Sequence, residues 1–194
     1  MIKVGLTGGI GSGKSTVSNI FASYGIPIYN SDDRAKWLMN NKAELIEAIC
    51  GIFGKKAYSK GNLDRKHIAS LAFEDKSLLT KLNQTVHPAV AADFENWCSV
   101  QISNFVIKEA AILIESGGYA QCNKIITVNA PVEVRIERVM KRDNCDSHTV
   151  LSRMQHQYTD EQRMEYADYI IHNTGQEHLI HQVRMIVDDL KHCS

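Results

Sequence analysis

The chain has 194 residues, of which 44% are hydrophobic, and its 22 Lys and Arg residues balance 22 Asp and Glu residues. This length predicts one sizeable core with at most a small appended subdomain. The zero net charge argues against recruitment by nucleic acid or an anionic membrane, so neither is an expected partner. Because no apolar stretch approaches the ~20 residues of a membrane span and no secretory leader is apparent, we expect a cytoplasmic protein.

The N-terminal part of the chain predicts a strand, a helix and a second strand. Residues 2–7 alternate in polarity and then break on glycine, as a buried strand does where it enters a loop. From Lys14 the apolar residues share one helical face, and Gly25 stands where a C-terminal cap belongs. The stretch "IPIYNSDD" (26–33) predicts a second strand that ends in carboxylates. Residues 31–102 are mostly helical in pattern, interrupted at "GKKAYSKGN".

Three more strands are expected in the rest of the chain, at "NFVIKEAAILIE" (104–115), "NKIITVNAP" (123–131) and "DYIIHNTG" (168–175). A helix starts at Pro131, and residues 143–166 are polar. A closing helix has an apolar stripe made of Leu179, Ile180, Val183, Ile186, Val187 and Leu190.

Strands that alternate with helices indicate right-handed crossovers and a mainly parallel sheet. The expected fold class is therefore α/β, with a five-stranded sheet covered by helices on both faces and with two helical insertions. Ligands of such sheets bind beyond the carboxyl ends of the strands.

Residues 8–15, "GGIGSGKS", match the phosphate-binding pattern G-x-x-x-x-G-K-[ST] between a strand and an amphipathic helix. Glycines allow successive N–H groups to turn toward phosphate oxygens, and the helix N-terminus adds its dipole. We expect Lys14 to bridge the terminal phosphates, Ser15 to bind magnesium, partly through water, and Thr16 to support the α-phosphate. The expected loop residues on the nucleotide are Gly8, Gly11, Ser12 and Gly13. The stretch predicts binding of a nucleoside triphosphate.

Several users of nucleoside triphosphates are excluded by missing motifs. GTPase switches need D-x-x-G, which is absent, and N-K-x-D, for which only the near misses "NKAE" and "NKII" occur. The L-S-G-G-Q motif of transporter ATPases is also absent. Phosphate transfer to a small molecule remains, with a kinase for another small alcohol or nucleoside as one alternative. A second alternative, from a different class, is an ATP-binding regulatory module.

Phosphoryl transfer needs a carboxylate that takes the acceptor proton. Asp32 and Asp33 follow the second expected strand, so they should face the same crevice as Lys14. Adjacent residues rarely both point inward, so we expect one to be the base or metal-side partner and the other to cap the helix that begins near Ser31. The alternative is that both are caps.

Five of the chain's arginines lie between residues 135 and 163. Arg135, Arg138 and Arg142 are spaced three and four apart, so one helical face presents all three. Guanidinium groups suit phosphate oxygens in a closing lid. We expect Arg142 to contact phosphate, and Arg135 to lie on a solvated face paired with acidic neighbours.

These residues resemble those of the dephospho-CoA kinase family over nearly the whole chain. The similar stretches are "GLTGGIGSGKST" (5–16), "GNLDRKHIASLAF" (61–73), "HPAV" (87–90), "AILIES" (111–116), "RVMKRD" (138–143) and "QYTDEQRMEYADYIIHNTG" (157–175). The resemblance implies a P-loop kinase with ATP and dephospho-CoA as its partners and Mg²⁺ as its cofactor. The implied reaction moves the ATP γ-phosphate to the ribose 3′-hydroxyl, the last step of coenzyme A synthesis.

The resemblance also implies residue roles. Asp32 matches the family's base, Arg142 its lid arginine and Lys14 its loop lysine. Residues matched to the adenine turn are Asn173 and Gly175, and those matched to the acceptor side are Thr7 and His87. Two positions depart from the family, where Asn30 replaces an aspartate and Ala111 replaces a proline.

The expected domain is a single P-loop kinase domain that is a monomer or a weak homo-oligomer. Its core comprises about residues 1–59, 104–139 and 167–194. An acceptor-binding helical insertion is expected at about 60–103, and a lid at about 140–166.

Overall fold

A computed structural model describes residues 1–175 and 178–192. The chain forms two compact units, one made of Met1–Asn30 with Gln101–Ser194 and the other of Ser31–Val100. Among the described residues, no helix is long and apolar enough to span a membrane.

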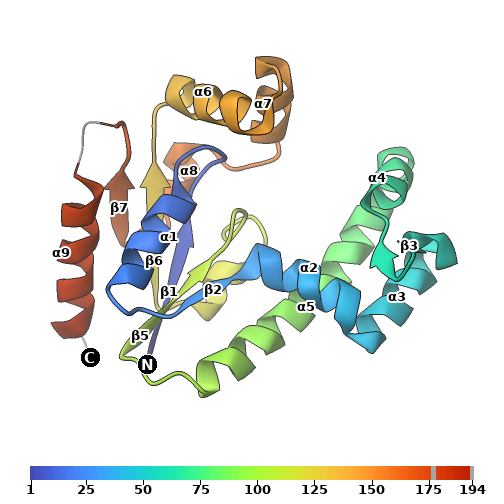
Figure 1. The fold of residues 1–194 in the computed structure, drawn as a ribbon, viewed down its shortest axis with the longest axis horizontal. Helices are drawn as coiled ribbons and strands as arrows, with labels where there is room; N and C mark the ends of the chain where they lie inside the picture. Colours follow the sequence, from blue (N-terminus) through green and yellow to red (C-terminus); the bar gives the residue numbers. More distant parts are fainter. Residues whose placement is uncertain (176–177, 193–194) are drawn as a thin grey trace. The chain divides into compact units, whose positions relative to one another are not determined.

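The first unit is built on a five-stranded sheet with strand order β2-β5-β1-β6-β7 (Figure 1). Every pairing in it is parallel. The strands are β1 (Ile2–Thr7), β2 (Ile28–Asn30), β5 (Phe105–Glu109), β6 (Lys124–Asn129) and β7 (Tyr169–His172). The predicted α/β class with a parallel five-stranded sheet is confirmed. The third strand is shorter than its apolar run, because the chain turns after Glu109.

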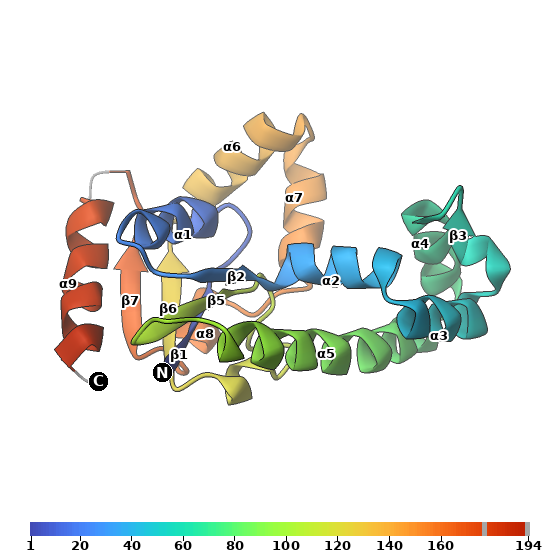
Figure 2. The same cartoon turned by 60° about the horizontal axis from the view of Figure 1, so that its bottom comes forward.

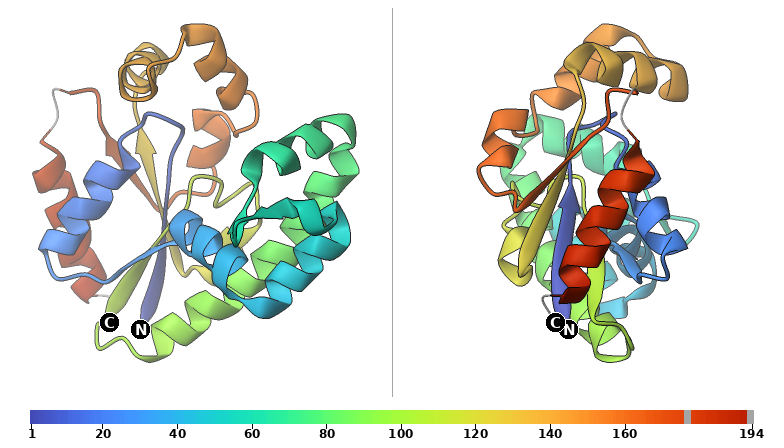
Figure 3. Two further views of the ribbon diagram at one scale, coloured as in Figure 1. Left: turned by 45° about the vertical axis from the view of Figure 1, so that its right-hand side comes forward. Right: turned by 90° about the vertical axis from the view of Figure 1, so that its left-hand side faces the viewer.

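Helices cover both faces of this sheet. In Figure 3, α1 (Lys14–Ser23) and α9 (Leu179–His192) lie on one face, and α8 (Asp160–Met164) lies on the other. The remaining helices of the unit are η2 (Gly118–Gln121), α6 (Val132–Asp143) and α7 (Ser147–Met154). Gly25 follows α1 with φ +78°, as its predicted place at the helix end requires.

The main core packs α1 and α9 against the sheet. Its fully buried members include Val17 and Phe21 from α1, Leu6 from β1 and Val183 from α9. The apolar stripe predicted for α9 is wrong at Ile180, which is 64% exposed. A helical period locates a face, but it does not say how wide a band the sheet will cover.

The second unit is mostly helical, as predicted. Its long helix α5 (Lys76–Ser99) packs against the other three helices of the unit (Figure 2). They are α2 (Ser31–Asn41), α3 (Ala43–Phe53) and α4 (Arg65–Glu74). The predicted interruption contains η1 (Lys55–Ala57) and a two-stranded antiparallel hairpin of β3 (Tyr58–Ser59) and β4 (Asn62–Leu63).

Two polar contacts fix helices of the second unit. Arg34 of α2 donates to the Asp93 carboxylate of α5, with Nη2 to Oδ1 at 2.6 Å. Asp64 caps α4 by accepting from the N–H groups of Lys66 and His67. The "GNLDR" stretch therefore ends a hairpin and starts a helix.

Candidate active site

The loop between β1 and α1 has the conformation that a phosphate cradle needs. Gly11 and Gly13 have φ values of +79° and +94°, in the left-handed region that favours glycine. A side chain on Gly13 would also collide with the Asn173 amide. The first N–H groups of a helix have no intrahelical acceptor, and in α1 they include those of Ser15 and Thr16. Backbone and helix start together form an anion site.

A carboxylate that the sequence reasoning missed lies beside this loop. The Ser15 hydroxyl donates to Glu109 Oε1 at 3.4 Å, and Glu109 is only 7% exposed. Glu109 ends β5, which pairs with β1, and its partner on β2 is Asn30. The signal in the sequence is an acidic residue inside the apolar run of residues 104–115, but that run does not show that the strand ends at Glu109 or that it neighbours β1.

The hydroxyl and the carboxylate fit a magnesium site. Both offer the hard oxygen atoms that Mg²⁺ prefers, and this ion usually binds through one or two protein groups together with substrate phosphates. Among the described residues, no cluster of three or more His, Cys, Asp or Glu side chains suits a metal ion. Ser15 and Glu109 therefore suit an ion that arrives with a nucleotide.

Arg135 does not lie on a solvated face, so that expectation is wrong. It is only 3% exposed, and its Nε donates to the Ile10 carbonyl oxygen at 3.0 Å. Its Nη1 also pairs with the Asp160 carboxylate at 2.9 Å. Burial lowers the pKa of the Arg135 guanidinium, and the charge of Asp160 opposes that shift. A buried guanidinium is stable only with hydrogen-bond and charge partners. Those of Arg135 come from the loop and from α8, not from acidic neighbours on its own helix, α6.

A second arginine completes the buried group. Arg163 is 1% exposed, and its Nη2 donates to Asp160 Oδ1 at 2.7 Å. Its Nη1 donates to the Tyr158 carbonyl oxygen and lies 3.7 Å from Glu115 Oε1. A side chain on Gly9 would collide with the guanidinium groups of both buried arginines. The loop thus packs at Gly9 against two guanidinium groups, which are themselves paired with carboxylates.

Arg142 lies on the surface. Its side chain is 62% exposed, and its Nε donates to Asp143 Oδ1 at 2.7 Å. Arg153 of α7 pairs with the other oxygen of Asp143 at 2.6 Å. Hydrogen bonds from Arg142 and then Arg153 lower the pKa of Asp143 to about 2, and the hydrogen bond to Asp143 raises the pKa of Arg142. Contact between Arg142 and phosphate stays a prediction.

The turn after β7 contacts the P-loop directly. The Asn173 side-chain amide donates to the Ser12 carbonyl oxygen at 2.8 Å in a buried position. Arg138 of α6 donates to the Asn173 carbonyl oxygen at 3.3 Å. Gly175 has φ +99°, which favours glycine in this turn. The structure therefore brings Asn173 and the loop together, a contact that the sequence did not indicate.

Two predicted site hydroxyls are buried. Thr7 is 0% exposed and Ser12 is 1% exposed, and neither hydroxyl has a hydrogen-bond partner within the described residues. Buried hydroxyls without a partner, here one at the end of β1 and one in the phosphate loop, are polar groups that a ligand or water can satisfy. The acceptor-side role of Thr7 stays a prediction.

The remaining predicted residues belong to the second unit. Asp32 and Asp33 are exposed in the first turn of α2, and Asp33 pairs with Lys36 at 2.6 Å. His87 is half-buried within α5, immediately before Pro88.

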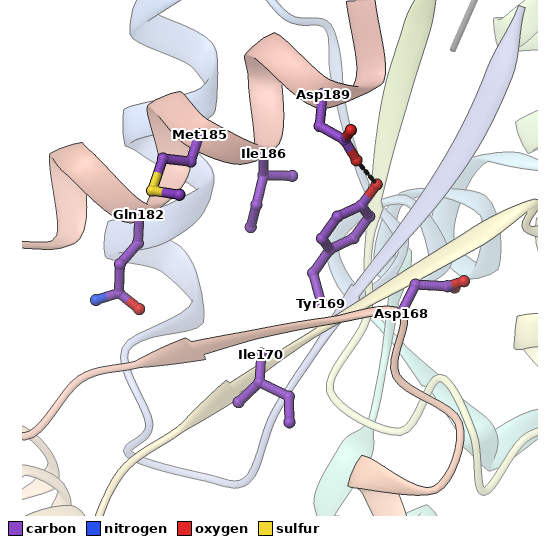
Figure 4. Close-up of a pocket in the computed structure, with 7 residues that line it drawn as sticks. All are labelled: Asp168, Tyr169, Ile170, Gln182, Met185, Ile186 and Asp189. Carbon is purple, nitrogen blue, oxygen red and sulfur yellow. Dashed lines mark hydrogen bonds between the residues drawn. The ribbon is translucent and has the colours of Figure 1, made fainter. Parts of the chain in front are cut away.

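A pocket of about 490 Å³ lies elsewhere in the first unit, on β7 and α9 (Figure 4). Its lining residues are Asp168, Tyr169, Ile170, Gln182, Met185, Ile186 and Asp189. The Tyr169 hydroxyl donates to the Asp189 carboxylate across it. The lining offers carboxylates but no lysine or arginine, so the pocket does not suit a triphosphate.

Comparison with known proteins agrees with this geometry. A family model described as dephospho-CoA kinase matches residues 2–178. The chain belongs to the dephospho-CoA kinase family. A dephospho-CoA kinase from Porphyromonas gingivalis is 38% identical over 192 residues, which cover 98% of this chain and 95% of that protein.

Solved structures extend the likeness to the fold. The structure of TT1252 from Thermus thermophilus superposes with a TM-score of 0.84 and 32% identity, covering 100% of this chain and 98% of that one. Dephospho-CoA kinase from Campylobacter jejuni gives a TM-score of 0.72 at 26% identity, with 98% of each chain covered. Family membership therefore extends over both units of the chain.

Proposed function

We propose that the protein transfers the γ-phosphoryl group of ATP to the 3′-hydroxyl of the ribose of dephospho-CoA, giving coenzyme A and ADP. The observation that carries this proposal is the glycine loop ahead of α1, in a chain that matches the dephospho-CoA kinase family from residue 2 to residue 178.

The donor side of the reaction is assigned to the P-loop. Backbone N–H groups of Gly11, Gly13 and the first turn of α1 bind the β- and γ-phosphates. Lys14, the first residue of that helix, neutralises charge on the transferred group. Arg142 does the same from the lid, after exchange of its exposed pairing with Asp143 for phosphate. Asn173 and Gly175 form the turn next to the adenine.

The acceptor side is assigned to Asp32. In the reaction the ribose oxygen bonds to the γ-phosphorus, the bond from that phosphorus to the β–γ bridging oxygen breaks, and the hydroxyl proton is released. Asp32 accepts that proton, because it matches the position of the family's base. Thr7 and His87 are assigned to acceptor binding.

Ser15 and Glu109 would hold Mg²⁺ together with the nucleotide phosphates. When bound, the ion neutralises charge on the β- and γ-phosphate oxygens. Asn30, the partner of Glu109 on β2, lacks the charge of the family's aspartate, and the carboxylate that accepts from the Ser15 hydroxyl is that of Glu109.

The other expected properties belong to the same proposal. The partners are ATP and dephospho-CoA rather than nucleic acid or membrane, and the chain acts in the cytoplasm as a monomer or a weak homo-oligomer.

One assay tests the proposal. Purified protein is mixed with ATP, magnesium and dephospho-CoA, and ADP and coenzyme A are quantified together. We expect the two products to form in equal amounts. A panel of other alcohols and nucleosides in place of dephospho-CoA tests the alternative kinase, and a faster rate with one of them would reassign the substrate. Nucleotide binding with transfer to no acceptor would instead indicate a regulatory module.

A further inference from the structure

A glutamine between α7 and α8 connects the P-loop to a second loop. The Ile10 N–H donates to Gln157 Oε1 at 2.8 Å. The same amide donates from Nε2 to the Ala111 carbonyl oxygen at 3.5 Å, a long hydrogen bond. Ala111 follows β5, two residues after Glu109. One carboxamide therefore lies between the phosphate loop and the segment that leaves β5.

Both backbone polar groups of Ile10 are bound by side chains from distant parts of the sequence. Gln157 receives its N–H and Arg135 donates to its carbonyl oxygen. The peptide groups on either side of Ile10 are therefore fixed in orientation. Fixing this side of the loop also restricts Gly11, whose left-handed backbone follows directly. The phosphate-facing part of the loop thus follows Ile10, a residue whose two peptide groups are held by side chains of the protein.

The two residues that bind Ile10 differ in their other interactions. Arg135 belongs to the buried charge group with Asp160 and Arg163, so its loss would disturb the fold. Gln157 is uncharged and only half-buried, so it can be replaced with a smaller effect on stability.

We propose that Gln157 is a positioning residue for phosphoryl transfer, because its carboxamide sets the orientation of the Ile10 peptide and links the P-loop to the segment after β5. This inference rests on the proposed function. Gln157 touches no reacting atom, and it acts on ATP through the loop. Its amide has both properties that the site requires, an acceptor for Ile10 and a donor for Ala111.

The test compares wild type with Gln157→Ala and Gln157→Glu. Alanine removes both hydrogen bonds, and we expect kcat/KM for ATP to fall about tenfold, as for a partly buried N–H left without its acceptor. The KM for dephospho-CoA and the melting temperature should change little. A role in folding alone would instead lower the melting temperature and the active fraction, without raising the KM for ATP.

The glutamate variant adds a readout in pH. As a carboxylate, the new side chain can accept from Ile10 but cannot donate to Ala111. When protonated, it regains a donor and imitates the amide. We therefore expect the activity of Gln157→Glu, relative to wild type, to be low at about pH 8 and to rise as the pH falls to about 4.5, close to the ordinary pKa of a glutamate side chain, where a large fraction of the new carboxyl group is protonated. Charged groups held around residues 10 and 157–160 are Glu115, Arg135, Asp160 and Arg163.

A matched control is Gln162→Glu. Gln162 lies five residues further on, and its Oε1 accepts from the Thr159 N–H in a capping box. Glutamate serves equally well at that position, so the control adds the same charge near the same helix without touching Ile10. Its activity relative to wild type should not depend on pH.

The possible outcomes separate this inference from the proposed function. Failure of wild type to form coenzyme A would overturn the proposed function and, with it, this inference. An active wild type with an unchanged kcat/KM for ATP in Gln157→Ala would overturn the positioning role alone. A Gln157→Glu enzyme that follows the Gln162→Glu control at every pH would do the same.

Discussion

At the scale of single residues, one of two adjacent carboxylates is assigned as the base. Asp33 pairs with Lys36 on its own helix, whereas Asp32 matches the family's base. We expect Asp32→Ala to lower turnover by about 10² or more, the range for loss of a general base, while ATP still binds. Single-turnover transfer and equilibrium ATP binding measure the two properties, and Asp33→Ala is the matched control. Normal transfer by the Asp32→Ala enzyme would exclude this residue as the base.

The proposed role of Glu109 can be tested through the magnesium dependence of the reaction rate. Its carboxylate accepts from the Ser15 hydroxyl at 3.4 Å at the end of β5. Replacement by glutamine keeps the shape and removes the charge, so we expect the magnesium concentration for half-maximal rate to rise about tenfold or more, as when a group supporting a metal ligand is lost. Titration of the rate with magnesium at saturating ATP measures this shift. Glu133→Gln, on the exposed side of α6, should leave the titration unchanged.

At the scale of elements, the sequence predicted what depends on neighbours along the chain. Alternation located the strands, and the glycine pattern located the loop before α1, because both follow from local backbone preferences. Arg135 was misplaced because its burial depends on Asp160, which is 25 residues away. Glu109 was missed because its proximity to Ser15 depends on the pairing of β5 with β1, and strand order is not visible in a periodicity.

The contact between α6 and α8 gives the prediction at this scale. Asp160 lies between Arg135 and Arg163, whose side chains are 4% and 1% exposed. We expect Asp160→Ala to lower the free energy of unfolding by about 3–5 kcal/mol, because it leaves buried charges without their carboxylate. Urea unfolding followed by circular dichroism measures the loss. Lys36→Ala, which breaks an exposed pair, should stay within about 1 kcal/mol of wild type.

At the scale of the whole molecule, the predicted binding residues divide between the two compact units. The P-loop, Arg142, Asn173 and Gly175 belong to the unit of Met1–Asn30 and Gln101–Ser194, whereas Asp32 and His87 belong to Ser31–Val100. The division into a core, an acceptor-binding insertion at about 60–103 and a lid at about 140–166 stays a prediction. This division implies that bound ATP and bound dephospho-CoA slow hydrogen exchange in different segments of the chain.

Hydrogen exchange can test that division. ATP with magnesium should slow exchange at the amides of residues 8–16, because phosphate oxygens become their acceptors. Dephospho-CoA alone should instead slow exchange within residues 60–103, where the acceptor-binding insertion is predicted. The control is Lys14→Ala, which should lose most of the protection by ATP and keep the protection by dephospho-CoA. If dephospho-CoA left residues 60–103 unprotected in wild type, the acceptor would have to be assigned to another segment, because a bound substrate that buries these helices must slow their local opening.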